Sequence, residues 1–278
     1  MVGGVPVLIR ESSSVFSHAE FIARGSTTFA PSRGGLAERL VRWLPEISVN
    51  RVAARNYAEF GRLLRERAPR PRVLVVGGSF LGQGMESFAA DPALELVETD
   101  VSFGPRVGAI CDAHDLPFES ESFDGVVLQA VLEHVADPVR CVSEVHRVLR
   151  RDGLVYAETP FMQQVHMGRY DFTRFTHLGH RRIFRAFDEL DSGAACGPGM
   201  ALAWSWQYFL RSFARTRAAR AALVAFARVT GFWLKYLDRF LLDRPAALDA
   251  ASGFYFLGRK SDKTLSDRDL IQLYRGAM

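Results

Sequence analysis

Cysteine, net charge and long apolar runs are all scarce in this sequence. Only three cysteines occur in 278 residues, at Cys111, Cys141 and Cys196, and they form no CxxC pair. The sequence therefore predicts neither a disulfide framework nor a zinc cluster, and a reducing cytoplasm is the expected compartment. The formal net charge is only +4, an excess too small to predict nucleic-acid binding.

No stretch has the length of a membrane-spanning helix. The most apolar region, residues 200–242, is interrupted by seven Arg and Lys residues, whereas a spanning helix needs about 20 apolar residues. The run Val5–Ile9 is too short for a signal peptide and lacks a basic leader, so export is not expected. A hydrophobic content of 48% with 24% charged residues instead predicts a folded globular chain.

The stretch Arg72–Gly84 has the pattern of a buried strand followed by a glycine-rich turn. Residues 73–76 are all apolar, which suits a strand covered on both faces. The four glycines that follow allow a tight turn and a close approach to a ligand. A helix over residues 85–90 would then direct its amino end at that ligand. Read alone, a glycine turn can equally be a plain strand-to-helix connection.

Strand-like and helix-like segments alternate after this turn, which predicts an α/β fold with a doubly wound, mostly parallel sheet. The further strands are expected at residues 94–99, 107–111, 122–129 and 154–159. A helix is expected over residues 138–149, and Gly153 suits its left-handed terminus. Helices are also expected at 36–44 and 50–67, whereas residues 1–35 have no sustained period and are expected to form loops or partly ordered chain.

Asp100 follows the second predicted strand directly. In doubly wound sheets, ligands bind outside the carboxyl ends of the strands, and an acidic residue about twenty positions after the glycine turn accepts hydrogen bonds from ribose hydroxyls. This placement fits NAD or another adenosyl ligand.

A series of motifs further along the chain distinguishes NAD from other adenosyl ligands. It comprises Asp112–Phe118, Ser122–Asp124, Leu132–Pro138 and Glu144–Gly153, in the wording DAHDLPF, SFD, LEHVADP and EVHRVLRRDG. The series resembles the class I S-adenosylmethionine-dependent methyltransferases, and more narrowly a small-molecule branch of them. The resemblance covers about residues 70–185. It implies a Rossmann-like sheet of seven strands and S-adenosylmethionine as the cofactor, with S-adenosylhomocysteine as the product.

The resemblance also implies a set of cofactor contacts. The ribose would lie against Asp100, and the adenine against Asp112 and Ala113. Val101 would be a further cofactor contact. The amino-acid part of the cofactor would lie in the glycine turn, and Gln129 would lie next to its methionine end. The turn residues in this set are Gly77, Gly78, Ser79 and Gly82. The chain departs from the family pattern at Val75, where an acidic residue is usual.

Candidate catalytic residues follow the fifth predicted strand. His166 is interpreted as a base or substrate orienter, with a capping or packing role as the alternative. Asp171 and Arg174 are interpreted as an ion pair that fixes this loop, or alternatively as catalytic groups. His177 and His180 share a helical spacing without nearby acidic ligands, so no metal is predicted.

The last third departs from the strand pattern. Residues 198–245 are expected to form helices inserted before a last, antiparallel strand at Gly253–Lys260. These helices either cover the substrate cleft or form a surface that meets a membrane, a lipid-linked substrate or a second subunit of a homodimer. The expected division is a helical lead-in at 1–70, a methyltransferase domain at 71–260 and a polar tail at 261–278.

The function that the resemblance implies is methyl transfer to an oxygen or nitrogen atom of a small molecule, such as a sugar, a polysaccharide precursor or a secondary metabolite. Two alternatives stay open on the residues alone. One is a non-catalytic protein that binds an adenosyl ligand, and the other is a nicotinamide-dependent oxidoreductase.

Overall fold

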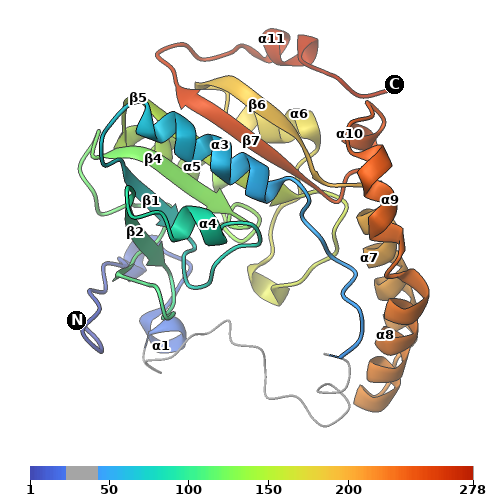
Figure 1. Ribbon diagram of the computed structural model, residues 1–278. Helices are drawn as coiled ribbons and strands as arrows, with labels where there is room; N and C mark the ends of the chain where they lie inside the picture. The colour runs from blue at the N-terminus through green and yellow to red at the C-terminus, as the bar shows by residue number, and fades with distance from the viewer. Residues whose placement is uncertain (23–42, 278) are drawn as a thin grey trace.

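One seven-stranded sheet organises the chain in the computed structural model, which describes residues 1–22 and 43–277 (Figure 1). The strands are β1 (Arg72–Val76), β2 (Glu95–Asp100), β3 (Ala109–Ile110), β4 (Phe123–Gln129), β5 (Leu149–Pro160), β6 (Phe187–Cys196) and β7 (Gly253–Lys260). Their order across the sheet is β3-β2-β1-β4-β5-β7-β6. Only β7 runs antiparallel to its neighbours β5 and β6. The predicted mostly parallel, seven-stranded fold is therefore confirmed.

The central strand β1 is the apolar run that precedes the glycine turn. It pairs in parallel with β2 on one side, where Val75 lies opposite Glu98, and with β4 on the other, where Val75 lies opposite Val127. Chain order reverses between these neighbours, because the chain runs from β1 outward through β2 to β3 on one side and then returns to β4 on the other. The carboxyl end of β1 is thus a topological switch point, which is where ligands bind in such sheets.

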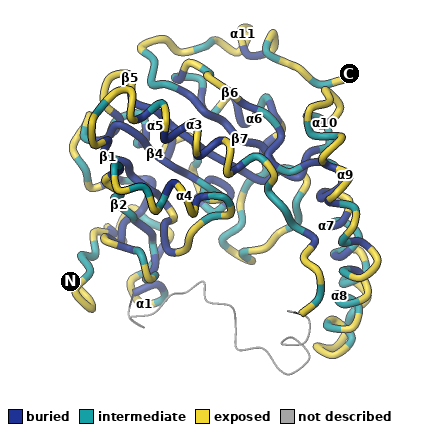
Figure 2. The backbone as a smooth tube through the Cα atoms, in the orientation of Figure 1, coloured by how far each residue is buried: buried dark blue, intermediate teal, exposed yellow. Residues whose placement is uncertain are grey.

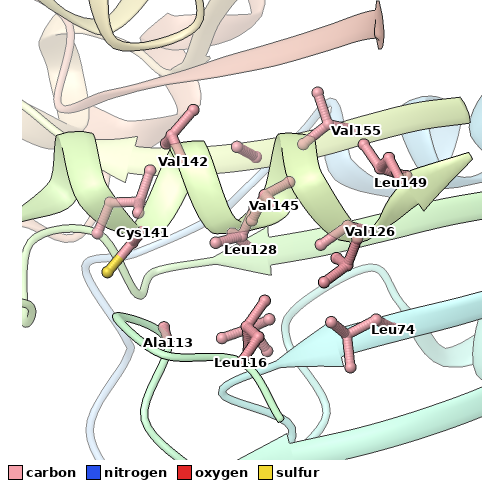
Figure 3. Packing of buried hydrophobic residues seen from close by; sticks show 14 of the residues in the cluster. Leu74, Ala113, Leu116, Val126, Leu128, Cys141, Val142, Val145, Leu149 and Val155 are labelled. Atoms are coloured by element: carbon pink, nitrogen blue, oxygen red, sulfur yellow. The ribbon is translucent and has the colours of Figure 1, made fainter. Parts of the chain in front are cut away.

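Helices cover both faces of the sheet. Two of them, α5 (Pro138–Val148) and α6 (His177–Ile183), lie on one face, and α3 (Ala53–Arg65) and α4 (Glu86–Ala89) lie on the other. Most of the sheet lies in the buried interior between these helices (Figure 2). Buried apolar residues form a core on each face. Figure 3 shows the core under α5, where Val145 of the helix lies beside Leu128 of β4. Asp137 caps the start of α5, because its side chain accepts a hydrogen bond from the Arg140 N–H.

The first 22 residues pack against one edge of the sheet. They contain a short 3-10 helix η1 (Glu11–Ser13) and a short helix α1 (His18–Phe21). Val7 forms a parallel bridge with Ile110, which extends the sheet beyond β3. Ile9, Phe16 and Phe21 are buried in a small core against Ile110. The segment is therefore partly ordered chain, because scattered apolar residues can bury against an open sheet edge without forming a helical period.

Gly153 has a different place in the structure from the predicted one. The structure places Gly153 inside β5, so it does not end a helix; Asp152 before it has the positive φ, 61°, that turns the chain. An added Cβ on Gly153 would lie 2.9 Å from the Arg150 carbonyl oxygen, so close packing explains this glycine. The helix predicted at 36–44 lies almost entirely outside the described residues.

The predicted helical insertion before the last strand is confirmed. Between β6 and β7 the chain forms α7 (Pro198–Arg211), α8 (Arg217–Gly231), α9 (Leu234–Leu241) and α10 (Ala247–Ala250). After β7, the helix α11 (Asp267–Gln272) packs near α6 and buries Leu270. None of the described helices is long and apolar enough to cross a membrane.

Candidate functional site

A cavity of about 220 Å³ lies at the carboxyl ends of β1, β2 and β4. Its walls are mostly apolar, with a few polar groups. The cofactor residues expected from the sequence that line it are Gly77, Ser79, Asp100, Val101, Asp112 and Ala113. An apolar cleft with carboxylates at two points suits a nucleoside, whose base is flat and apolar and whose edges carry hydroxyl and amino groups.

The glycine turn is shaped by its neighbours. Gly77 has φ +75°, and an added Cβ would lie 2.6 Å from the Val131 side chain. Gly82 faces Gln129, whose Oε1 would lie only 1.6 Å from a Cβ at this position. Gly78 lines none of the described cavities, and its N–H donates to the Thr99 carbonyl at 2.8 Å. Two of the glycines therefore let the backbone approach the site closely, and the third fixes the turn to β2.

Asp100 is the last residue of β2 and is only 7% exposed. Its carboxylate accepts hydrogen bonds from the N–H groups of Ser79, at 3.2 Å, and Ser102, at 3.0 Å. Burial raises the pKa of Asp100, and these hydrogen bonds oppose the rise. The carboxylate thus ties the glycine turn to the cavity wall and still faces the cavity.

Asp112 is held by its own set of donors. Its Oδ1 accepts from the backbone N–H of His114 at 3.0 Å and from His114 Nδ1 at 2.6 Å. Its Oδ2 accepts from the hydroxyl of Ser14 in the N-terminal segment. Burial opposes ionisation, but the bonds from His114 and Ser14 hold the pKa of Asp112 below its usual value. The carboxylate is therefore charged, and the N-terminal segment already contacts it.

Gln129 belongs to a buried polar network at the carboxyl ends of β4 and β5. Its Oε1 accepts from the Tyr57 hydroxyl at 2.9 Å, and its Nε2 donates to Glu158 Oε2 at 2.9 Å. Asn50 Nδ2 donates to the same carboxylate oxygen at 2.8 Å. Burial raises the pKa of Glu158, and the donors around it oppose the rise. With Gly77 and Gly82, Gln129 also lines a small cavity of about 40 Å³.

A second cavity, of about 120 Å³, lies beside the first. Ala130 lines both of them, immediately after β4, and it has φ +54°, which is uncommon for a residue with a Cβ. Its N–H donates to the Glu158 carbonyl at 3.0 Å. Strained backbone of this kind concentrates at functional sites, and here it marks the boundary between the two cavities.

Glu133 lines the second cavity and is fully buried. Both of its carboxyl oxygens lack a hydrogen-bond partner among the described residues. Burial raises the pKa of Glu133 to about 8, so the group is largely protonated at neutral pH. Buried polar groups are nearly always paired, so an unpaired carboxyl group in a cavity wall points to a role with a ligand.

Two histidines face this carboxyl group. His134 Nε2 lies 3.6 Å from Glu133 Oε1, and His166 Nε2 lies 3.9 Å from the same oxygen. The other ring nitrogen of each histidine contacts a backbone carbonyl, that of Tyr170 at 2.8 Å and that of Gln164 at 3.3 Å. A carbonyl only accepts, so Nδ1 carries the proton in both rings and each Nε2 keeps a lone pair.

Burial keeps both rings neutral. It lowers the pKa of His134 to about 4 and lowers the pKa of His166 as well. Only His166 of the two lines the second cavity, whereas His134 lines the first. A neutral imidazole beside the second cavity can accept a proton from a ligand there.

Asp171 and Arg174 form an ion pair beside this cavity, with Arg174 Nη2 2.9 Å from Asp171 Oδ2. Burial opposes ionisation of Asp171, but the bond from Arg174 lowers its pKa to about 2. The same Oδ2 accepts from the His166 N–H at 2.8 Å, and Arg174 Nε donates to the Gln163 carbonyl at 2.8 Å. The pair therefore holds the His166 loop in place and does not line either cavity.

The structure adds several wall residues that the sequence analysis did not identify. The first cavity is also lined by Phe16, Phe80, Val131, Met167 and Tyr170. The ring of Phe16 stacks on that of Tyr170 with centroids 5.6 Å apart, so the N-terminal segment and the loop after β5 cover the cavity together. His177 and His180 lie in neither described cavity wall and are buried in α6.

Glu133, His134 and His166 also have the spacing of a metal site, because their nearest ligand atoms lie within 4.8 Å of one another. The sequence did not predict this cluster, since the histidines weighed there for metal binding were His177 and His180. The sheet order brings it together, because the first two residues follow β4 and the third follows its neighbour β5.

The region around these cavities is similar to known proteins. Residues 77–157, from the glycine turn into β5, match the family model described as "Methyltransferase domain". This match covers less than a third of the chain, and it contains Asp100, Asp112, Gln129 and Glu133.

Two curated relatives match parts of the chain. Demethylmenaquinone methyltransferase of Thermotoga maritima is 28% identical over 118 residues, which is 42% of this chain and 46% of that protein. Protein MJ1123 of Methanocaldococcus jannaschii is 29% identical over 122 residues, which is 43% of this chain and 56% of that protein. The chain thus spans about half the length of these relatives.

Among solved structures, the 1,6-didemethyltoxoflavin N1-methyltransferase of Burkholderia thailandensis with bound S-adenosylhomocysteine is 15% identical, with a TM-score of 0.44. The alignment covers 76% of this chain and 79% of that one.

Proposed function

We propose that this protein is a class I S-adenosylmethionine-dependent methyltransferase that transfers a methyl group from S-adenosylmethionine to an oxygen or nitrogen atom of a small acceptor. The match of residues 77–157 to a methyltransferase domain supports the proposal. The observation that carries the proposal is the pair of adjoining cavities. One has the character of a nucleoside site, and the other holds a neutral histidine and an unpaired carboxyl group; they meet at Ala130.

The residues of the first cavity fit the adenosyl part of the cofactor. Asp100 and Asp112 are acceptors for ribose hydroxyls and an adenine amino group, and Val101 and Ala113 provide apolar walls. Gly77 and Gly82 leave room for a ligand to approach the backbone, and Gln129 lies next to them. When bound, S-adenosylmethionine supplies a methyl group that is already activated by the positive sulfonium.

The chain's own residues then have two tasks. The first is to hold the acceptor atom in line with the methyl group and to exclude water. The second is to take up the proton that the acceptor loses. His166 Nε2 carries a free lone pair at the second cavity, so the proton of the acceptor's O–H or N–H group passes to this atom. Asp171 positions the His166 backbone for this transfer.

The acceptor is proposed to be a hydroxyl- or amine-bearing small molecule, such as a sugar or a secondary metabolite. The second cavity measures about 120 Å³, well below the about 300–1,000 Å³ of sites that enclose drug-sized ligands. Its walls combine polar groups, Glu158, Gln163 and His166, with the apolar ring of Phe254. Such a mixture suits one polar ring or chain of a larger molecule.

Calorimetry with S-adenosylmethionine, S-adenosylhomocysteine and NAD, followed by a panel of sugars, phenols and amines assayed for S-adenosylhomocysteine release, tests the proposal. Binding of both adenosyl ligands and release with at least one acceptor class are expected. Binding of NAD alone would show that the oxidoreductase alternative is correct. Tight adenosyl binding with no turnover on any acceptor would favour the non-catalytic alternative.

A further inference from the structure

Helices α7 to α9 carry a concentration of exposed apolar side chains. Nine large ones between positions 202 and 240 are 40–66% exposed. They are Leu202, Phe209, Phe213, Phe226, Val229, Trp233, Tyr236, Leu237 and Phe240. Exposed apolar side chains that gather in one part of a surface mark sites of interaction, whereas singly scattered ones do not.

The spacing of these side chains places them in stripes. Trp233, just before α9, and Tyr236, Leu237 and Phe240 within it have the i, i+3, i+4, i+7 spacing of one helix face. On α8, Phe226 and Val229 are three residues apart. On α7 and the turn after it, Phe209 and Phe213 are four residues apart, and their ring centroids are 5.3 Å apart. The exposed apolar side chains therefore fall on shared helix faces and are not scattered at random.

Positive charge is concentrated in the same helices. Residues 198–246 contain eight Arg and Lys against two Asp, a net charge of +6, whereas the rest of the chain contains 27 Arg and Lys against 29 Asp and Glu. Arg215, Arg217, Arg220 and Arg239 are exposed. The basic character of the protein thus belongs to the insertion and not to the sheet.

The insertion stands at the edge of the molecule. Figure 1 shows α7, α8 and α9 as a separate group beside the sheet, and Figure 2 shows α8 as largely exposed or intermediate. Trp206 Nε1 donates to Thr230 Oγ1 at 2.9 Å and so fixes α8 on α7. The apolar stripes are consequently presented on a packed helical pair and not on a loose segment.

We propose that α7, α8 and α9 form a surface that binds the face of an anionic lipid bilayer. Exposed Phe, Trp and Leu side chains insert at the boundary between headgroups and acyl chains, and Arg side chains bind the anionic headgroups. A second copy of the chain would bring two surfaces of charge +6 together, which disfavours a dimer through this face. A nucleic acid would neutralise the charge but leave the apolar stripes in water.

The surface lies close to the second cavity. Helix α7 holds the loop after β5, because the Tyr208 hydroxyl donates to the Val165 carbonyl at 2.8 Å and Gln164 Nε2 donates to Ser205 Oγ at 3.1 Å. A bilayer bound at α7 to α9 would therefore lie one helix away from His166. If the proposed function holds, the acceptor is a lipid-linked molecule, but binding to the bilayer does not depend on that function.

Sedimentation with lipid vesicles tests the surface directly. The full chain is mixed with vesicles of phosphatidylcholine alone or of phosphatidylcholine with phosphatidylglycerol at 4:1, at low and high salt, without any acceptor. The protein is expected to sediment with the anionic vesicles, and less at high salt. The double variants R217E/R220E and F226S/W233S are each expected to lower the apparent affinity about tenfold or more.

Matched controls lie on other parts of the surface. R70E/R268E reverses two exposed arginines, and I271S replaces a side chain that is 66% exposed on α11. Both controls are expected to bind vesicles like the parent, with circular dichroism confirming that every variant is folded. The proposal is overturned if the parent does not sediment with anionic vesicles, or if the insertion variants bind the vesicles as tightly as the controls do. It is also overturned if F226S/W233S instead dissolves a dimer seen by size exclusion.

Discussion

Nε2 of His166 lies 3.9 Å from Oε1 of Glu133, a carboxyl group without exposed surface. The two residues follow neighbouring strands of the sheet, β4 and β5, and their side chains meet in the wall of the second cavity. Burial favours the neutral form of each group, so the pair can take up a proton without holding a permanent charge.

Replacing His166 by Gln should slow methyl transfer without weakening cofactor binding. General base catalysis by a positioned histidine is typically worth about 10²- to 10⁴-fold in rate, and kcat on the best acceptor of the panel should fall within that range. The parent's kcat should fall with decreasing pH only below about 6.5, because burial lowers the pKa of His166 and keeps the ring unprotonated above it. His146→Gln, on α5, is the control, and equal turnover in both variants would remove His166 from the mechanism.

Replacing Glu133 by Gln should change how stability depends on pH. Burial raises the pKa of Glu133 from 4.5 to about 8, so the folded state binds a proton here that the unfolded state releases above pH 4.5. The parent should therefore lose about 1.4 kcal/mol of unfolding free energy per pH unit between pH 5 and 8 through this group. The neutral amide of the variant removes this loss.

Urea unfolding of both proteins at pH 5, 6, 7 and 8 measures the difference. The variant should become more stable relative to the parent as the pH rises, since the neighbouring groups His134, His166, Asp171 and Arg174 are common to both proteins. A difference that stays constant across this range would show that Glu133 ionises normally in the folded state.

Replacing Asp100 by Asn should weaken binding of S-adenosylhomocysteine. The loss of a charge-assisted hydrogen bond costs about 1.5–3 kcal/mol, or roughly 10- to 150-fold in Kd. Calorimetry on the variant and on Asp115→Asn, a partly exposed carboxylate near the same edge of the sheet, separates this effect from a general loss of charge. Equal affinity in the two variants would place the ribose elsewhere.

Replacing Phe16 by Ala tests the cover over the first cavity. Phe16 is 4% exposed, lines the cavity and packs on Phe21 and Tyr170. Its removal opens the cavity to water, so the affinity for S-adenosylhomocysteine should fall by about tenfold, the value of roughly 1.4 kcal/mol of buried apolar contact. The neighbouring Val15→Ala, at a side chain that is 49% exposed, is the matched control and should bind normally.

Affinities of both variants are measured by calorimetry below their melting temperatures, because Phe16 also belongs to a small buried core. A third variant, Phe16→Leu, keeps an apolar side chain over the cavity and should retain most of the affinity. If Phe16→Ala binds as tightly as Val15→Ala, the N-terminal segment does not cover the cofactor.

The sheet and its helices were predictable because their signals are local. The apolar run at 73–76, the glycines after it and the helical period of 138–149 each specify an element within a few residues of sequence. The strand order then follows from the rules of doubly wound sheets and from the family resemblance. The insertion was predictable for the same reason, since residues 200–242 have a helical period and no strand pattern.

The second cavity could not be predicted in this way. Its chemistry depends on Glu133 lying beside His166, a contact that spans 33 positions and that no local pattern specifies. Nor does sequence show that both oxygens of Glu133 are buried without partners among the residues that the structure describes, because burial and hydrogen bonding are properties of the assembled fold. The contact between Ser14 and Asp112 was missed for the same reason, as it joins two segments 98 residues apart.

Metal binding provides the last test of the Glu133 cluster. Its three ligand atoms are close enough to hold an ion, but burial keeps Glu133 largely protonated at neutral pH, which leaves two neutral imidazoles as ligands. Structural and catalytic zinc sites use at least three protein ligands. We therefore expect Zn²⁺ or Mg²⁺ at 1 mM to leave the melting temperature at pH 7 unchanged, and dialysis against EDTA to leave S-adenosylhomocysteine release unchanged. A metal-dependent rise in melting temperature that His166→Gln abolishes and His146→Gln retains would show instead that the cluster ionises to bind a metal. The proton-transfer role of His166 would then be wrong, because its Nε2 lone pair would be occupied by the ion.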